Sequence, residues 1–119
     1  MQKAASEFQR NLLMFPKRQR ISKGTFAKTT QNGRRVTGTY LTVTKNNIQQ
    51  NEPSRFAVVV LKKVAAKAVT RNLIRRRVYH ILHTLLKKDT GHTYVVFAKK
   101  KTDEQTHTTL QKELTSLLS

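Results

Sequence analysis

The apolar residues of this chain follow two periodicities, one typical of helices and one typical of strands. From about residue 66 to residue 88 they recur every three or four positions, which predicts one long helix with a single buried face. That face carries Ile74, Val78, Ile81, Leu82 and Leu85. The opposite face carries Asn72, Arg76, His80 and His83. The helix is therefore expected to lie against a core on one side and to meet solvent or a polar partner on the other.

Three stretches rich in β-branched and aromatic residues predict the strands. Residues 34–45 are expected to be extended, and residues 93–98 form the last strand. Residues 55–61 are almost uniformly apolar, which predicts a strand buried at the centre of the sheet. The polar stretch 46–54 contains a proline and is expected to be a loop.

Two shorter helices are predicted on either side of these strands. The first runs from Ser22 to Asn32, carries Phe26 inward, and ends at Gly33 in a conformation with positive φ. The second opens at a capping-box pair, Thr102 and Gln105, and buries a row of leucines. Residues 1–19 are interpreted as an N-terminal extension with helical spacing, and residues 20–119 as a single domain. The order of elements predicts an α+β fold, one small sheet with helices packed on a face.

The charge of the chain is strongly one-sided. Lysine and arginine number 24 against 6 aspartates and glutamates, which gives a net charge of +18. Between residues 62 and 77, seven of sixteen positions are basic and none is acidic. Such a density repels itself and weakens the folded state unless a polyanion lies against it. Because 37% of the residues are hydrophobic, a disordered basic tail is disfavoured, and the pattern predicts a folded surface that binds nucleic acid.

The candidate RNA-binding residues lie where the strand 55–61 passes into the long helix. They are Lys62, Lys63, Lys67, Arg71, Asn72, Arg75 and Arg76. Arginine can pair with phosphate through two parallel hydrogen bonds, and the free N–H groups at a helix start also attract anions. Replacing Arg71 or Arg76 by alanine is accordingly expected to flatten the salt dependence of RNA binding by about one unit. The alternative is a solvated charged face without a partner.

Other chemistries find weaker support in the sequence. Since cysteine is absent, disulfides and thiolate metal sites are excluded, and a cytoplasmic location is expected. His80 and His83 stand one turn apart, as metal ligands can, but a polar pair beside RNA is the favoured interpretation. The six carboxylates are scattered, whereas two-metal cleavage of a phosphodiester needs converging ones. The longest apolar run, residues 56–61, is too short to cross a membrane, so no membrane partner is expected. Because cysteine is absent and the carboxylates are scattered, no metal site is expected either.

The stretch from Lys62 to Arg76 resembles the protein subunit of bacterial ribonuclease P. That family carries two lysines at the end of a strand, an Ala-Val pair, and an Arg-Asn motif that opens a long helix. The matching residues here are Lys62-Lys63, Ala68-Val69 and Arg71-Asn72, with Phe26, Gly33-Arg34, Tyr40 and Arg55 in the expected order upstream. The resemblance covers about residues 20–118. Departures stand at Leu61, Ala65, Leu73, Tyr79 and His80, where the family often has Ser, Gly, Arg, Arg and Glu.

The resemblance implies a fold with the order αβββαβα. It has a small mixed sheet of about four strands, a long helix in a left-handed β-α-β crossover, and short helices at either end. It also implies that Phe26 and Tyr40 line a cleft for the 5′ leader of precursor tRNA, although a packing role is at least as consistent with their sequence context.

The resemblance further implies a division of labour within a ribonucleoprotein that removes the leader during tRNA maturation. The RNA subunit holds the catalytic Mg²⁺ ions, and the small basic protein binds that RNA and the leader. No catalytic residue, dedicated metal site or small-molecule substrate is then expected in this chain. A ribosomal protein or another protein that binds structured RNA remains the alternative, because size and charge alone also fit it.

Overall fold

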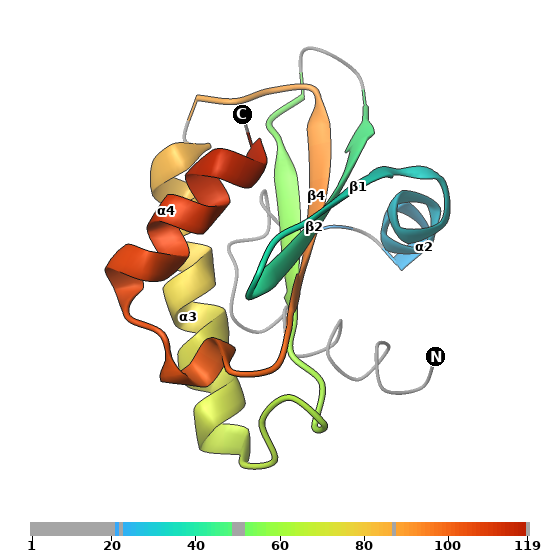
Figure 1. Cartoon of the computed structure of the whole chain (residues 1–119). Coiled ribbons are helices and arrows are strands. Elements are labelled where there is room, and N and C mark those ends of the chain that lie inside the picture. Colours follow the sequence, from blue (N-terminus) through green and yellow to red (C-terminus); the bar gives the residue numbers. More distant parts are fainter. Residues whose placement is uncertain (1–20, 22, 49–51, 87, 119) are drawn as a thin grey trace.

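Four strands form one mixed sheet in the computed structural model of this chain, which describes residues 21, 23–48, 52–86 and 88–118. The strands are β1 (Arg34–Thr37), β2 (Leu41–Asn47), β3 (Arg55–Val59) and β4 (His92–Ala98). Their spatial order is β1-β2-β4-β3 (Figure 1). Strand β2 pairs antiparallel with both β1 and β4, whereas β3 pairs parallel with β4.

Helices cover both faces of this sheet. Helix α3 (Ala68–Leu85) connects the parallel strands β3 and β4, and α4 (His107–Leu118) follows β4 after a short 3₁₀ turn, η2 (Thr102–Glu104). Figure 1 shows α3 and α4 on one face and α2 (Lys23–Asn32) on the other. The order αβββαβα and the α+β class are therefore confirmed, while the predicted extension 1–19 lies outside the described residues.

The alternation of side chains along the strands divides the core into two layers. The larger layer lies between the sheet and helices α3 and α4. It contains Leu41, Val43, Phe56, Val58, Tyr94 and Val96 from the sheet and Ile74, Val78, Ile81, Leu82, Leu110 and Leu114 from the helices. The smaller layer lies on the α2 side and contains Ile21, Ala57, Val59 and Val95, with Phe26, Leu61 and Phe97 half-buried against it.

The placement of β3 corrects one prediction. Its uniformly apolar sequence predicted a central strand, but β3 lies at the edge of the sheet and β4 lies inside it. The strand is apolar because both of its faces are covered, by α3 on one side and by the Ile21 layer on the other. Burial of the two faces says nothing about neighbours within the plane of the sheet.

The ends of three elements also differ from prediction. Helix α3 is shorter at both ends than expected, and Leu85 in its last turn is exposed. Gly33 does not take a positive φ; glycine is needed there because a Cβ atom would lie 2.5 Å from the carbonyl oxygen of Thr29. The predicted cap at Thr102 opens only the 3₁₀ turn, and α4 begins at His107, where the hydroxyl of Thr106 accepts a hydrogen bond from the Thr109 N–H at 3.2 Å.

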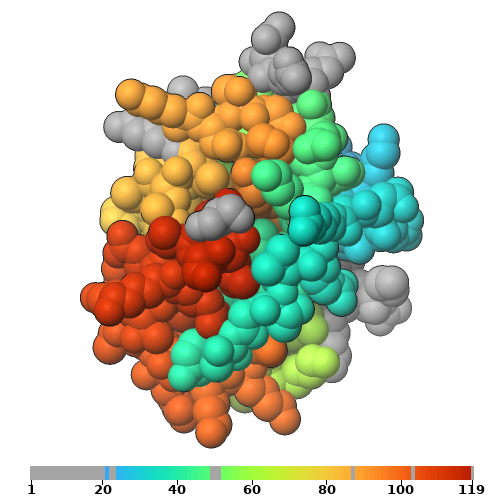
Figure 2. Space-filling model, turned by 45° about the horizontal axis from the view of Figure 1, so that its top comes forward, coloured from blue at the N-terminus to red at the C-terminus, as the bar shows by residue number. Residues whose placement is uncertain are grey.

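The turn between β1 and β2 is held from outside the sheet by α4, and Figure 2 shows α4 lying against these two strands. The carboxylate of Glu113 accepts hydrogen bonds from the backbone N–H groups of Thr39 and Tyr40, both at 2.8 Å. The ammonium of Lys99 donates to the Gly38 carbonyl at 2.9 Å, and the Thr102 hydroxyl donates to the Tyr40 carbonyl at 2.8 Å. These contacts connect the turn to the segment that follows β4. Of the helices described, none has the length and hydropathy that a bilayer span requires.

Candidate nucleic-acid interface

The segment between β3 and α3 forms a tight turn that presents its lysines to solvent (light green, at the bottom of Figure 1). The backbone N–H groups of Val64 and Ala65 both donate to the Leu61 carbonyl, at 2.9 and 3.2 Å. Lys62 and Lys63 lie at the exposed tip of this turn, and Lys67 is exposed at the start of the helix. The structure therefore brings three predicted RNA-binding lysines to one cationic loop.

Arg71 supports this loop from beneath. Its side chain is only 4% exposed, and Nη1 donates to the carbonyl oxygens of Ala65 at 3.0 Å and Ala66 at 2.7 Å. The guanidinium thus ties the end of the cationic loop to the first turn of helix α3. With 4% of its surface exposed, Arg71 has little of its side chain accessible to RNA.

Arg75 is also an interior residue, with an exposed fraction of 0%. Its Nη1 donates to Oδ1 of Asn72, which is itself half-buried. Arg71, Arg75 and Val78 follow one another at intervals of four and three residues, so both arginines project from the face of α3 that meets the sheet. Helical spacing alone could have revealed this, because Arg71 and Arg75 share the face of Val78.

Arg76 points the other way and is exposed. The seven predicted residues therefore fall into two groups, and their contacts with RNA stay a prediction. The exposed group is Lys62, Lys63, Lys67 and Arg76; the interior group is Arg71 and Arg75, with Asn72 half-buried between them.

The start of α3 is open to an anion. Lys67 occupies the cap position in an extended conformation with no side-chain hydrogen bond to the helix, and the first turn contains no acidic residue. The first N–H groups of a helix have no partner within it and carry partial positive charge. They add to the charge of the cationic loop at the point where the loop enters the helix.

Phe26 and Tyr40, the two aromatic residues expected to line one cleft, lie in different layers. Phe26 packs beside Ile21 on the α2 side of the sheet, whereas Tyr40 packs against the core beneath α3 and α4. The structure does not bring them together. A role for either residue in binding a leader stays a prediction.

The histidines of α3 also separate. His83 stacks on Tyr79 at 5.9 Å between ring centroids, while His80 faces His107 of α4 at 5.8 Å. Within the ranges that the structure describes, no three His, Cys, Asp or Glu side chains come together as metal ligands.

A polar cluster that sequence reasoning missed lies where α3 passes into β4. Oδ2 of Asp89 accepts hydrogen bonds from the hydroxyls of Ser54, at 2.5 Å, and Tyr94, at 3.1 Å, and lies 3.0 Å from Nδ1 of His92. Burial raises the pKa of the Asp89 carboxyl, but these hydrogen bonds together outweigh burial and hold the pKa below its ordinary value of 3.8. Burial, followed by the charge of Asp89, raises the pKa of the Tyr94 hydroxyl. Residues 54, 89, 92 and 94 carry no recognisable spacing, so only the fold reveals the cluster.

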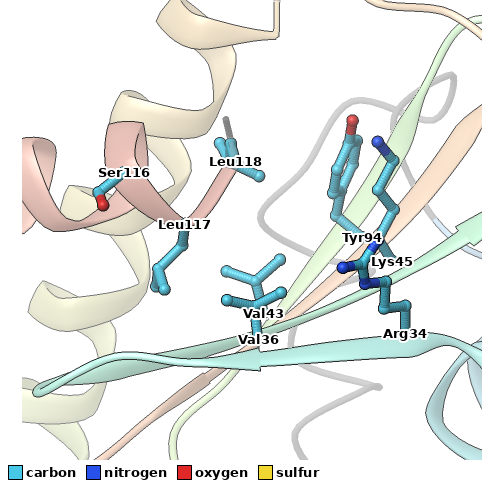
Figure 3. Close-up of a pocket in the computed structure, with 8 residues that line it drawn as sticks. All are labelled: Arg34, Val36, Val43, Lys45, Tyr94, Ser116, Leu117 and Leu118. Carbon is cyan, nitrogen blue, oxygen red and sulfur yellow. The ribbon is translucent and has the colours of Figure 1, made fainter.

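A pocket of about 270 Å³ opens between the sheet and the end of α4 (Figure 3). Arg34, Lys45 and Tyr94 lie on one side of it, and Leu117 and Leu118 on the other, with Val36 and Val43 at the base. Arg34 and Lys45 stand directly opposite each other on β1 and β2, and the Lys45 ammonium lies 5.9 Å from the centre of the Tyr94 ring. Like charges placed opposite each other destabilise a sheet slightly. Because Arg34 and Lys45 both line it, the pocket is a second concentration of positive charge, distant in sequence from the cationic loop.

Comparison with known protein families decides the relationship of this chain. The family model described as Ribonuclease P matches residues 15–119, which is most of the sequence. The chain belongs to the ribonuclease P family. Direct comparison with curated protein sequences finds no match.

Solved structures of ribonuclease P proteins agree with this assignment. A ribonuclease P protein of Thermotoga maritima is 26% identical, with a TM-score of 0.69; the alignment covers 78% of this chain and 87% of that one. A mutant ribonuclease P protein of Staphylococcus aureus is 23% identical, with a TM-score of 0.76 and coverage of 93% and 92%. The fold expected from the resemblance is thereby confirmed.

The chain is thus a protein component of ribonuclease P and takes part in tRNA processing. The alternative of a ribosomal protein is not favoured by these comparisons.

Proposed function

We propose that this chain is the non-catalytic, RNA-binding subunit of ribonuclease P. In this proposal it binds the RNA subunit through the cationic loop and the outer face of α3, and thereby assists removal of the 5′ leader from precursor tRNA. The observation that carries the proposal is the exposure of Lys62, Lys63, Lys67 and Arg76 on a stretch of sixteen residues without one carboxylate. A folded RNA would neutralise this charge and so stabilise the loop.

The geometry suggests how the chain would do this. Arg71 fixes the backbone of the loop through two carbonyl oxygens, so the exposed lysines are presented on a defined turn rather than on a flexible tail. Binding then needs little additional ordering of the loop, and less binding free energy is lost to conformational entropy. The open start of α3 offers N–H groups to a phosphate at the same place.

In the same proposal the bond-breaking step belongs to the RNA subunit and its Mg²⁺ ions. The chain would supply positive charge around that RNA, which reduces the repulsion between phosphates and so the concentration of Mg²⁺ that the complex requires. The protein would contribute no ligand of its own to the ion. A cytoplasmic location, where precursor tRNA is available in bacteria, is part of the proposal.

The 5′ leader would bind on the α2 side of the sheet. Phe26 and Phe97 are half-buried there and keep part of their surface accessible. An aromatic face of this kind can stack on an unpaired base, which contributes about 1–3 kcal/mol per base. Tyr40, on the other side of the sheet, is left out of this proposed surface.

Reconstitution tests the proposal. The full chain is added to ribonuclease P RNA, and cleavage of precursor tRNA is measured as a function of Mg²⁺ concentration. The wild-type chain should lower the Mg²⁺ requirement, and a variant with Lys62, Lys63 and Arg76 changed to alanine should lose most of that effect. A control with Lys88, Lys100 and Lys112 changed to alanine removes the same charge from three other exposed positions, away from α2, and should retain it.

Two outcomes would contradict the proposal. The first is a Mg²⁺ requirement that the wild-type chain leaves unchanged. The second is removal of the leader by the protein without any RNA subunit, with the activity lost in a chelator.

A further inference from the structure

Two apolar side chains interrupt the cationic face of α3. Val69 is 79% exposed and Leu73 is 44% exposed, the highest values among the large hydrophobic residues that the structure describes. They stand four residues apart in α3 and therefore lie side by side on its surface. The other aliphatic residues in the middle of the helix, Ile74 and Val78, are buried in the core.

The pair lies within the same surface as the proposed phosphate contacts. Arg76 follows Leu73 by three residues, so Val69, Leu73 and Arg76 form one stripe on the side of α3 that faces away from the sheet. Lys67 is exposed one turn or less before this stripe, in the segment without acidic residues. A polyanion that covers these cations must also cover the two apolar side chains.

Phosphates cannot be the partners of Val69 and Leu73. Desolvating a phosphate against an aliphatic group removes water from the charge and returns no hydrogen bond. The parts of RNA that can pack on aliphatic carbon are the ribose carbons and the faces of unstacked bases, which single-stranded and bulged segments expose.

We infer that Val69 and Leu73 pack against the ribose and base of an unstacked nucleotide of ribonuclease P RNA, with Lys67 and Arg76 on the phosphates to either side. This inference rests on the proposed function and adds to it an apolar contact that does not depend on salt. Leu73 stands where the family often has arginine, so this chain has an exposed apolar side chain at a position that is often cationic in the family.

The salt dependence of binding separates the two kinds of contact. Each phosphate neutralised by a cation contributes about −0.9 to the slope of log K against log salt for a duplex and about −0.7 for a single strand, whereas an apolar contact contributes nothing to that slope. Filter binding of the full chain to ribonuclease P RNA at several salt concentrations therefore measures the charge contacts, as the slope, separately from the apolar contact, as a change in affinity at constant slope.

Leu73→Ala should weaken binding by about tenfold at every salt concentration, equal to about 1.4 kcal/mol, and leave the slope unchanged. Leu73→Arg should steepen the slope by about one unit, and Arg76→Ala should flatten it by about one unit. Leu85→Ala provides the matched control, because Leu85 is another exposed leucine of α3, in its last turn, and should bind as wild type. Alanine favours helix, so both leucine variants should remain folded, and circular dichroism checks this.

Binding by Leu73→Ala that equals wild type, or a slope altered in that variant, overturns the inference. Self-association of the wild-type chain that is lost in Leu73→Ala also overturns it, because the apolar pair would then belong to a second copy. If wild type binds the RNA and Arg76→Ala flattens the slope while Leu73→Ala is neutral, the inference fails and the proposed function stands. If wild type does not bind the RNA, both fail.

Discussion

Arg71 and Arg76 belong to the same basic segment, but replacing each of them by methionine should change a different property of the protein. Arg71 is buried and donates two hydrogen bonds to backbone carbonyls, whereas Arg76 is exposed. We therefore expect Arg71→Met to lower the stability of the protein and Arg76→Met to lower its affinity for RNA. Methionine is chosen because it keeps the unbranched apolar stem of arginine and removes only the charged group.

The magnitude for Arg71 follows from its two contacts. A hydrogen bond that involves a charged group contributes about 1.5–3 kcal/mol to stability. Both bonds come from a single nitrogen, and the carbonyl of Ala66 belongs to an exposed residue and can turn to water when its partner is lost. The loss should therefore amount to about 2–4 kcal/mol. An exposed side chain such as Arg76 changes stability by about 0.5 kcal/mol or less.

Urea denaturation gives the stability of each variant, and filter binding between 50 and 200 mM salt gives its RNA affinity. Arg76→Met should flatten the slope of log K against log salt by about one unit at nearly unchanged stability. Arg71→Met should unfold at lower urea and should keep the wild-type slope, because no phosphate contact is removed.

The reverse result would refute this reasoning. If Arg71→Met has the stability of wild type and a slope flatter by one unit, then Arg71 reaches RNA directly. The salt prediction made from sequence alone would then hold for both arginines.

Three further predictions concern the contacts that hold the fold. Glu113→Ala removes the acceptor of two backbone N–H groups in the β1–β2 turn, and should lower the free energy of unfolding in urea by about 2–4 kcal/mol. The folded pKa of Asp89 lies below 3.8, so its contribution to stability is present above pH 3.8 and is lost as the pH falls through the lower, folded value. The difference in urea midpoint between wild type and Asp89→Asn should therefore shrink below pH 3.8, and a constant difference would contradict the assignment. Gly33→Ala places a Cβ 2.5 Å from the Thr29 carbonyl and should lower the melting temperature, with Gly24→Ala, whose Cβ meets nothing within 4 Å, as the control.

The sequence predicted which elements form and in what order, because hydrophobic periodicity is local information. The 3.6-residue spacing of Ile74, Val78, Ile81 and Leu82 is enough to define α3 and its buried face. The place of each strand within the sheet is not local information. Strand β3 and an internal strand can have the same composition when helices cover both of their faces, and only the hydrogen-bonded neighbours distinguish them.

The sequence predicted the candidate site as a set of basic residues, and the structure shows which of their side chains point to solvent and which point into the protein. Lysines at the tip of a turn are exposed in almost any arrangement, so the placement of Lys62 and Lys63 followed from their position after a strand. The helical spacing of Arg71 and Arg75 relative to Val78 already places both on the sheet-facing side of α3, but the carbonyl and amide oxygens that hold them there are seen only in the structure. A run of basic residues therefore defines a region of high charge, and it does not define how many of its members can touch a ligand.

The inside position of β4 determines when the chain can first take its shape during synthesis. Among the described strands, β4 is the one beside β3, and it also joins β3 to β2. Until residues 92–98 have left the ribosome, β3 and the lysines that follow it have no neighbouring strand to hold them. Before that point the nascent chain presents these lysines to any nucleic acid nearby without a sheet behind them, and an RNA that selects the finished turn can do so only after β4 has been made.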